Sequence, residues 1–346
     1  TSLEQTVLGE NVTKLGAKAF YNCRKLNLSM TLPKKLTVIE PSVFQGCMGL
    51  SGNLVIPEGV TTIRENAFNG CSGLTGDLDI PEKVTTIGND AFNGCSGFGG
   101  TLTLPDSLKS IDRYAFYGCS EITGELVIPG KITEIPYGTF SGMQKVTSVV
   151  LGEKVENIWT GYDSEHAFYQ WNNVETVRFL SAVPPTVNSR YSTKYSVFYS
   201  MPNLKTVYIP QGTYQVYNSQ YGDGIKAGVR LKEEGSGDFV ITDGELISYS
   251  GTDTEVAVPD QVTRIGTGAF RNNTTIQKVT LPAGVTAIGA YGFNNCTALT
   301  EVDYTDSSNL TEIGESAFSG CTSLEQTVLG ENVTKLGAKA FYNCRK

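Results

Sequence analysis

Eight cysteines and one histidine are the side chains of this 346-residue sequence most suited to metal binding or catalysis. Paired cysteines and clustered histidines hold zinc, while Cys–His and Ser–His–Asp arrangements provide nucleophiles. The sequence has no C-x-x-C motif, and the lone histidine, His166, cannot form a cluster. We therefore predict no metal site, no cofactor and no catalytic residue, so that the chain is not an enzyme. His166 is expected at the surface or in a turn.

The cysteines recur at one position of a repeat. Cys71, Cys95 and Cys119 are 24 residues apart, and Met143 and Trp171 take the same position in other repeats. A position that accepts methionine and tryptophan is a packing position, where free cysteine behaves as a small apolar residue. The spacing therefore predicts buried thiols rather than disulfides.

The whole sequence is organised by this repeat, which an Ala-Phe pair or a variant of it marks. Alternating residues before Pro57 indicate a strand, which ends there because proline cannot donate to a strand ladder. Val60 and Ile63 begin a second buried segment. One such unit cannot bury enough apolar surface alone, so we expect the units to stack. The repeated phenylalanines are Phe20, Phe44, Phe68, Phe92, Phe116, Phe140, Phe168, Phe198, Phe270, Phe293, Phe318 and Phe341.

Residues 50–71 follow the run L-x-x-x-L-x-I-P-x-x-V-x-x-I-x-x-x-A-F-x-x-C, which resembles the BspA-type leucine-rich-repeat family. The resemblance covers nearly the whole chain. It implies a repeat solenoid: a right-handed leucine-rich-repeat solenoid, rich in β-strands, with short helical or 3₁₀ turns and a concave parallel sheet. It also implies a cell-surface or secreted protein of oral or gut anaerobes or mucosal protozoa, which attaches to host matrix proteins or to other cells. Any export signal or anchor is expected outside this segment.

Irregular segments suggest two arrays. Residues 1–234 form the first array, with a closing cap at about 181–234 that is rich in tyrosine. Residues 235–346 form a second array, which begins with an opening cap at about 238–260. The pattern therefore places a closing cap in the middle of the chain.

Residues 1–25 are identical to residues 322–346, whereas other repeats match only in their core positions. Three explanations stay open: a tandem array of near-identical units cut out of phase, an engineered permutation, or an error where the sequence was joined. If the duplication is real, both copies fit the same place in the stack. We therefore expect head-to-tail self-association or swapping.

The net charge of −8 comes from 35 acidic and 27 basic residues. It argues against nucleic acid and anionic lipid as partners, because both are bound by clustered lysine and arginine. No apolar run is long enough to span a bilayer, so no membrane insertion is expected in this segment. Asp77 and Asp79 lack the density of oxygen ligands that a calcium loop has.

Aromatic residues concentrate between residues 159 and 221, where they either fill wide irregular coils or form a partner site. As the partner site we predict four residues, Trp159, Tyr162, Arg178 and Tyr208. A second candidate surface is the row of outward strand positions, mostly small and polar, which includes Val55, Val127, Val150 and Thr206. Three functions stay open. The first is binding of a host extracellular or cell-surface protein, the second is binding of a glycan, and the third is a structural spacer.

Overall fold

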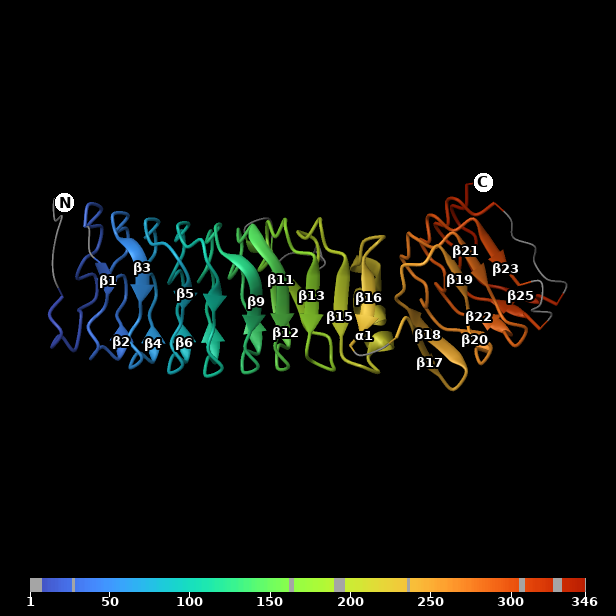
Figure 1. Cartoon of the computed structure of the whole chain (residues 1–346), viewed down its shortest axis with the longest axis horizontal. Helices are drawn as coiled ribbons and strands as arrows, with labels where there is room; N and C mark the ends of the chain where they lie inside the picture. Colours follow the sequence, from blue (N-terminus) through green and yellow to red (C-terminus); the bar gives the residue numbers. More distant parts are fainter. Residues whose placement is uncertain are drawn as a thin grey trace. The chain divides into compact units, whose positions relative to one another are not determined.

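The computed structural model describes residues 8–26, 29–161, 165–189, 197–234, 237–304, 309–325 and 332–345. Two compact units divide the chain between Leu204 and Lys205. Each unit is a stack of short, mostly parallel strands joined by turns (Figure 1), which confirms the predicted repeat solenoid. In the described residues no helix combines the length and apolarity needed to cross a membrane.

Two strands from each coil build the first unit. The first strand of each coil, which a proline follows in the first five of these coils, gives β1 (Ser29–Thr31), β3 (Ser51–Val55), β5 (Leu78–Asp79), β7 (Leu102–Thr103), β9 (Thr123–Ile128), β11 (Lys145–Leu151) and β13 (Thr176–Phe179). The segment before the Ala-Phe turn gives β2 (Val38–Ile39), β4 (Thr62–Ile63), β6 (Thr86–Ile87), β8 (Ser110–Ile111), β10 (Glu134–Ile135), β12 (Asn157–Thr160) and β14 (Thr186–Ser189). We call these the first strands and the second strands.

Stacked phenylalanine rings run through the core of the first unit. From Phe20 to Phe140 the ring centroids of successive coils are 5.3 to 5.7 Å apart, and the rings are nearly parallel. Each interior ring touches one ring above and one below, so no single coil has a core of its own. Stability is therefore shared between neighbouring coils, as in other repeat proteins.

The cysteine position has a second role besides packing. The Cys71 thiol donates to the Phe44 carbonyl oxygen at 3.1 Å, and Cys95 does the same to Phe68. Trp171, which replaces cysteine, places its indole N–H 2.8 Å from the Phe140 oxygen. Six of the eight cysteines are buried and the other two are half-buried, which confirms the packing interpretation. The position therefore selects an apolar group that can also donate to the carbonyl of the preceding coil.

Two left-handed residues shape most of the described Ala-Phe turns. In one coil they are Asn66, with φ 56°, and Gly70, with φ 76°. Glycine adopts this conformation without strain, while asparagine tolerates it. The Gly70 position also lies close to the same glycine of the neighbouring coil, because a Cβ on Gly94 would lie 3.8 Å from the Gly70 Cα. These constraints explain why glycine recurs two residues after the phenylalanine.

The second unit begins with β15 (Thr206–Ile209), α1 (Tyr214–Tyr221), the 3₁₀ turn η2 (Gly222–Gly224) and β16 (Arg230–Glu233), which pairs with β15 in parallel. An antiparallel hairpin of β17 (Phe239–Thr242) and β18 (Glu245–Tyr249) follows, at the place of the predicted opening cap. Its first strands are β19 (Glu255–Ala257), β21 (Lys278–Thr280) and β23 (Glu301–Asp303). Its second strands, β20 (Arg264–Ile265), β22 (Ala287–Ile288), β24 (Glu312–Ile313) and β25 (Lys335–Leu336), continue the sheet of β17 and β18.

His166 was expected at the surface or in a turn, and it lies in the turn before Phe168 but not at the surface. The side chain is buried, and its Nδ1 accepts a hydrogen bond from the Phe168 N–H at 3.2 Å within the turn. The irregular coil that contains His166 is longer than the 24-residue repeat, and the imidazole lies inside that wider turn. A buried histidine that already accepts a backbone N–H has a structural use there.

Candidate binding surfaces

The second strands of the first unit form two sheets instead of one. The order β2-β4-β6-β8 ends at β8, and a new sheet, β10-β12-β14, begins in the next coil. Elsewhere the ladder is regular: Gly88 N–H donates to the Ile63 oxygen, and Asp112 N–H donates to the Ile87 oxygen. The coils of β8 and β10 stay joined at their turns, where Phe116 N–H donates to the Thr139 oxygen. The break is therefore local.

Pro136 explains the break. It takes the position that Gly88 and Asp112 have in the two preceding coils, directly after the second strand. Proline has no N–H, so the ladder bond to the Ile111 oxygen cannot form. In the described residues the Thr133 N–H also has no partner on β8. The equivalent Lys109 N–H, one coil earlier, donates to the Thr85 oxygen in the coil of β6. The strand edges of two adjacent coils consequently part at this point.

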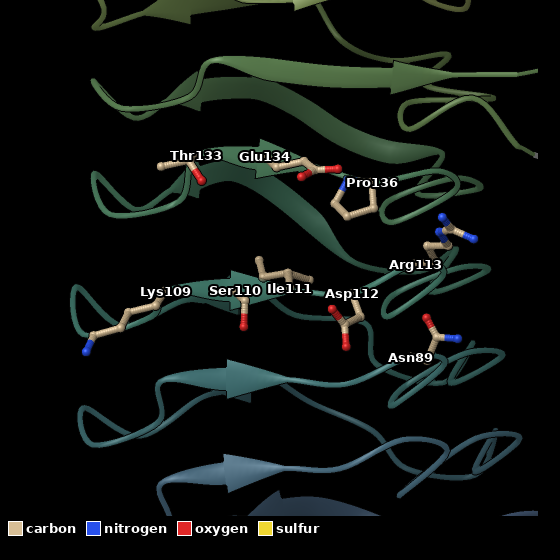
Figure 2. A pocket seen from close by; sticks show the side chains of 9 residues that line it. All are labelled: Asn89, Lys109, Ser110, Ile111, Asp112, Arg113, Thr133, Glu134 and Pro136. Carbon is tan, nitrogen blue, oxygen red and sulfur yellow. The ribbon is translucent and has the colours of Figure 1, made fainter. Parts of the chain in front are cut away.

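A groove of about 490 Å³ opens at the break, and Figure 2 shows its side chains on and beside β8 and β10, with Asn89 on the turn after β6. An adjoining hollow of about 240 Å³ shares three of its residues and adds Tyr137 and Trp159. Together the two openings have the size of a small-molecule site. The residues that line the groove are Asn89, Lys109, Ser110, Ile111, Asp112, Arg113, Thr133, Glu134 and Pro136.

Three side chains from consecutive coils lie against one another beside the groove, with the Tyr137 and Trp159 rings tilted by 50°. The Arg113 guanidinium lies 5.5 Å from the centre of the Tyr137 ring, and the Tyr137 ring centre is 5.3 Å from that of Trp159. Tyr137 is buried, whereas Trp159 is half-buried. The Trp159 Nε1 is buried without a hydrogen-bond partner in the described residues. This arrangement thus places a partly exposed aromatic face and a cation at one end of the groove.

The charges of the groove are balanced. Lys109 and Arg113 are cationic, while Asp112 and Glu134 are acidic. Partial burial raises the pKa of the Asp112 carboxyl, which nearby Arg113 lowers by a smaller amount. Among the described residues no three histidine, cysteine or acidic side chains gather closely enough to hold a metal ion.

The first strands present a second surface, which we call the ladder face. It consists of outward positions in equivalent places of successive coils: Thr31, Val55, Asp79, Thr103, Val127 and Arg178. Thr31 is in register with Val55, and Asp79 with Thr103. Val55 and Val127 are 52% and 47% exposed. Of the outward positions in the sequence-based row, Val150 and Thr206 are instead buried.

The four predicted partner-site residues do not share one described surface. Trp159 lies on β12 beside the groove, whereas Arg178 lies on β13, in register with Val150 of β11. Tyr208 lies on β15 in the second compact unit, half-buried and in register with Lys232. Tyr162 lies outside the described residues. Pro136 was not predicted as the cause of the groove, although a proline at a position of glycine or aspartate was a visible signal.

Most of the described aromatic side chains between 159 and 221 fill the interior. Trp171 is buried at the cysteine position, and Tyr214, Tyr217 and Tyr221 are buried on α1. Tyr199 is exposed and Trp159 half-exposed. The explanation that irregular coils need bulky side chains therefore accounts for most of this concentration.

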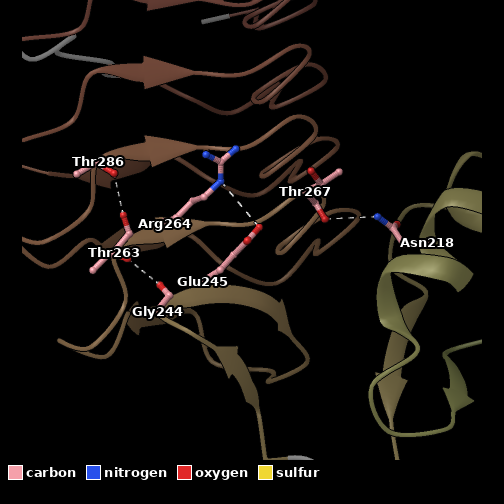
Figure 3. A network of polar contacts seen from close by, with 7 residues as sticks. All are labelled: Asn218, Gly244, Glu245, Thr263, Arg264, Thr267 and Thr286. Atoms are coloured by element: carbon pink, nitrogen blue, oxygen red, sulfur yellow. Dashed lines mark hydrogen bonds and ion pairs between the residues drawn. The ribbon is translucent and has the colours of Figure 1, made fainter.

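Within the second unit, α1 contacts the coil that follows the opening hairpin. The Tyr214 hydroxyl donates to the Gly268 oxygen at 2.7 Å, and the Asn218 amide reaches the Thr267 oxygen (Figure 3). The domain boundary at residue 234 stays a prediction, while the compact units of the structure divide at residue 204. Burial raises the pKa of the Tyr214 hydroxyl, which fits its place inside this contact.

Comparison with known proteins identifies the family. A model described as "BspA type Leucine rich repeat region" matches six times, over residues 1–97, 76–185, 100–224 and 248–346. No curated protein gave a significant match.

Several solved structures are similar at low identity. One is a leucine-rich repeat protein from Bacteroides ovatus, with 20% identity and a TM-score of 0.42, covering 95% of this chain and 79% of that one. Another is a leucine rich cell surface protein from Faecalibacterium prausnitzii, with 24% identity and a TM-score of 0.37, covering 99% and 78%. The family model covers most of the chain by itself: this chain belongs to the BspA-type leucine-rich-repeat family.

Proposed function

We propose that this chain is a non-catalytic recognition module, displayed on a cell or secreted, that binds a host or neighbouring-cell protein through its ladder face. The observation that carries the proposal is the row of exposed outward side chains on the first strands. Two large apolar side chains, Val55 and Val127, are about half exposed within this row. Family membership supports the repeat architecture of the module. The partner, a host or neighbouring-cell protein, is part of the proposal.

The chemistry of the ladder face suits a protein more than a small molecule. Protein interfaces combine an apolar centre with a polar rim, and arginine is enriched in them. Here the exposed Val55 and Val127 flank Asp79 and Thr103 along the stack, and Arg178 lies farther along the same row. Strand backbones also hold these side chains in fixed places, which lowers the entropy cost of binding.

The test measures binding of the purified chain to immobilised host matrix proteins by surface plasmon resonance. We expect the double variant Val55→Asp/Val127→Asp to lose at least tenfold in affinity, because each aspartate removes an apolar contact and adds a charge that must be desolvated. Arg178→Ala should lose less. Thr62→Asp and Thr86→Asp are matched controls, since both lie on second strands.

Two outcomes would contradict the proposal. One is equal affinity of the ladder variants and the controls. The other is the lack of any matrix or cell-surface protein that binds the folded wild-type chain. The second outcome would favour the structural-spacer alternative.

A further inference from the structure

The groove between β8 and β10 differs in chemistry from the ladder face and lies on other strands. We propose that this groove binds a neutral saccharide, whose hydroxyl groups bridge the parted strand edges and whose ring packs on Trp159. The proposal goes beyond protein binding by the ladder face and does not depend on it.

Each parted strand edge lacks a backbone ladder bond in the described residues, at an acceptor on the β8 side and at a donor on the β10 side. The Ile111 oxygen loses its donor because Pro136 has no N–H, and the Thr133 N–H finds no partner on β8. A ligand that bridges such a gap must donate on one side and accept on the other. A hydroxyl group does both at once, whereas a carboxylate or phosphate only accepts and an ammonium group only donates.

The side chains of the groove favour a ligand without net charge. Lys109 and Arg113 balance Asp112 and Glu134, so an anion or a cation gains little attraction overall. Each of these groups can still bond a hydroxyl, and charge-assisted hydrogen bonds are about twice as strong as neutral ones. The Asn89 amide adds both a donor and an acceptor at the same wall. A polyhydroxylated neutral ligand uses all of these groups.

The aromatic end of the groove suits the apolar face of a sugar ring. Trp159 is half-buried and is held against Tyr137, so its exposed part has a defined orientation. The Arg113 guanidinium also lies over the Tyr137 ring and is among the residues that line the groove. The groove and the adjoining hollow share Arg113, Glu134 and Pro136, so a ligand can extend from the strand gap to Trp159.

The experiment screens the full chain on an array of neutral, sialylated and sulfated glycans, followed by calorimetric titration of the neutral glycan that binds best. Pro136→Ala is the most informative variant, because alanine supplies the missing N–H to the Ile111 oxygen and allows the ladder to close. We expect its affinity to fall at least tenfold while its melting temperature stays the same or rises. Glu134→Gln and Trp159→Ala should each also lose about tenfold.

Matched controls come from the same repeat positions in other coils. Glu312→Gln lies at the position of Glu134, and Arg64→Ala lies at the position of Pro136 and Trp159. Both should bind within twofold of wild type. Circular dichroism separates a loss of fold from a loss of binding. If Trp159→Ala fails to fold, Glu134→Gln still tests the site, because it keeps the shape of the side chain.

Three results would overturn the proposal: no neutral glycan bound by the folded chain, binding of anionic glycans only, or unchanged affinity in both Pro136→Ala and Glu134→Gln. Protein binding that depends on Val55 and Val127 but not on Pro136 would leave the proposed function standing while this inference fails. Glycan binding that depends on Pro136, without protein binding that depends on Val55 and Val127, would support this inference while the proposed function fails.

Discussion

Residues 8–25 and 332–345 belong to two copies of one sequence, and they bury different faces. Leu15 is 9% exposed, whereas its counterpart Leu336 is 54% exposed. Alanine shows the reverse, because Ala19 is exposed and Ala340 is buried. Burial in this fold is therefore a property of the neighbouring coil more than of the residue.

Hydrogen bonds show the same asymmetry. In the first copy the Phe20 N–H donates to the Val43 oxygen of the following coil. In the second copy the Ala340 oxygen accepts from the Phe318 N–H of the preceding coil. Each copy thus forms half of the bonds that an interior coil such as that of Phe68 forms on both sides. The two copies together represent one interior coil.

High pH should produce the largest effect, because it acts on several thiols at once. Burial raises the pKa of Cys119 to about 12 and that of Cys344 to about 11, from 9.0 for an exposed thiol. Between about pH 9 and the raised pKa values of about 11 to 12, the unfolded chain releases protons that the folded chain keeps, so stability falls across this range. Urea unfolding under reducing conditions at pH 8, 9.5 and 10.5 measures this loss.

Cys119→Val is the control for that series, because valine cannot ionise. Its stability should depend less steeply on pH than that of wild type. An equal slope in the two chains would show that tyrosine residues, rather than the buried thiols, cause the loss.

Leu15→Ser and Leu336→Ser make the same change in the same sequence. We expect Leu15→Ser to lose about 2 kcal/mol of unfolding free energy, the value of burying a leucine side chain. Leu336→Ser should lose less than about 0.5 kcal/mol, since exposed substitutions have small effects. Denaturant unfolding checks both values, and equal losses would mean that the neighbouring coils do not set burial as described.

Gly16 and Gly337 are equivalent in the two copies, and we expect a smaller effect here, caused by steric contact. A Cβ on Gly337 would clash with the backbone nitrogen of Glu315, whereas a Cβ on Gly16 would meet nothing within 4 Å. We expect Gly337→Ala to destabilise by about 1 kcal/mol and Gly16→Ala to be neutral within about 0.5 kcal/mol. Thermal unfolding of the two variants side by side tests this, and a loss in Gly16→Ala alone would reverse the assignment.

Self-association should show the smallest free-energy difference of these comparisons, because a contact within one chain is exchanged for the same contact between two chains. We propose that residues 332–345 of one chain can replace residues 8–25 on the following coil of a second chain, since both copies offer that coil the same contacts. Exchange of identical interfaces costs little, so association should depend mainly on concentration. Light scattering over a concentration series should show head-to-tail oligomers of the 346-residue chain.

The leucine variants also sharpen this prediction. Leu15→Ser weakens the contact within one chain and should increase association, whereas Leu336→Ser weakens the replacing copy and should decrease it. A strict monomer at high concentration for wild type and for Leu15→Ser would rule the exchange out.

Several parts of the fold were predictable because they repeat. Cys71, Cys95 and Cys119 show the 24-residue period in the sequence. In the structure each of their thiols donates to the equivalent phenylalanine carbonyl oxygen of the preceding coil. Repetition lets weak local signals add up over many coils. Places without a repeat were harder to predict, as the buried His166 shows.

The candidate surfaces were only partly predictable. Exposure of Val55 and Val127 follows from strand alternation, but the burial of Val150 does not. Trp159 was predicted as a partner residue, and it lies beside the groove, while Arg178 lies on another sheet. Chain separation of 19 residues carries no information about which sheet a residue joins.

The repeat pattern alone was enough to establish the stacked solenoid, the phenylalanine core and the buried thiols, because each depends on contacts between equivalent residues. The groove required the folded chain. A single proline removes one N–H, and whether that loss opens the ladder depends on how the backbones of two neighbouring coils lie, which no residue specifies by itself.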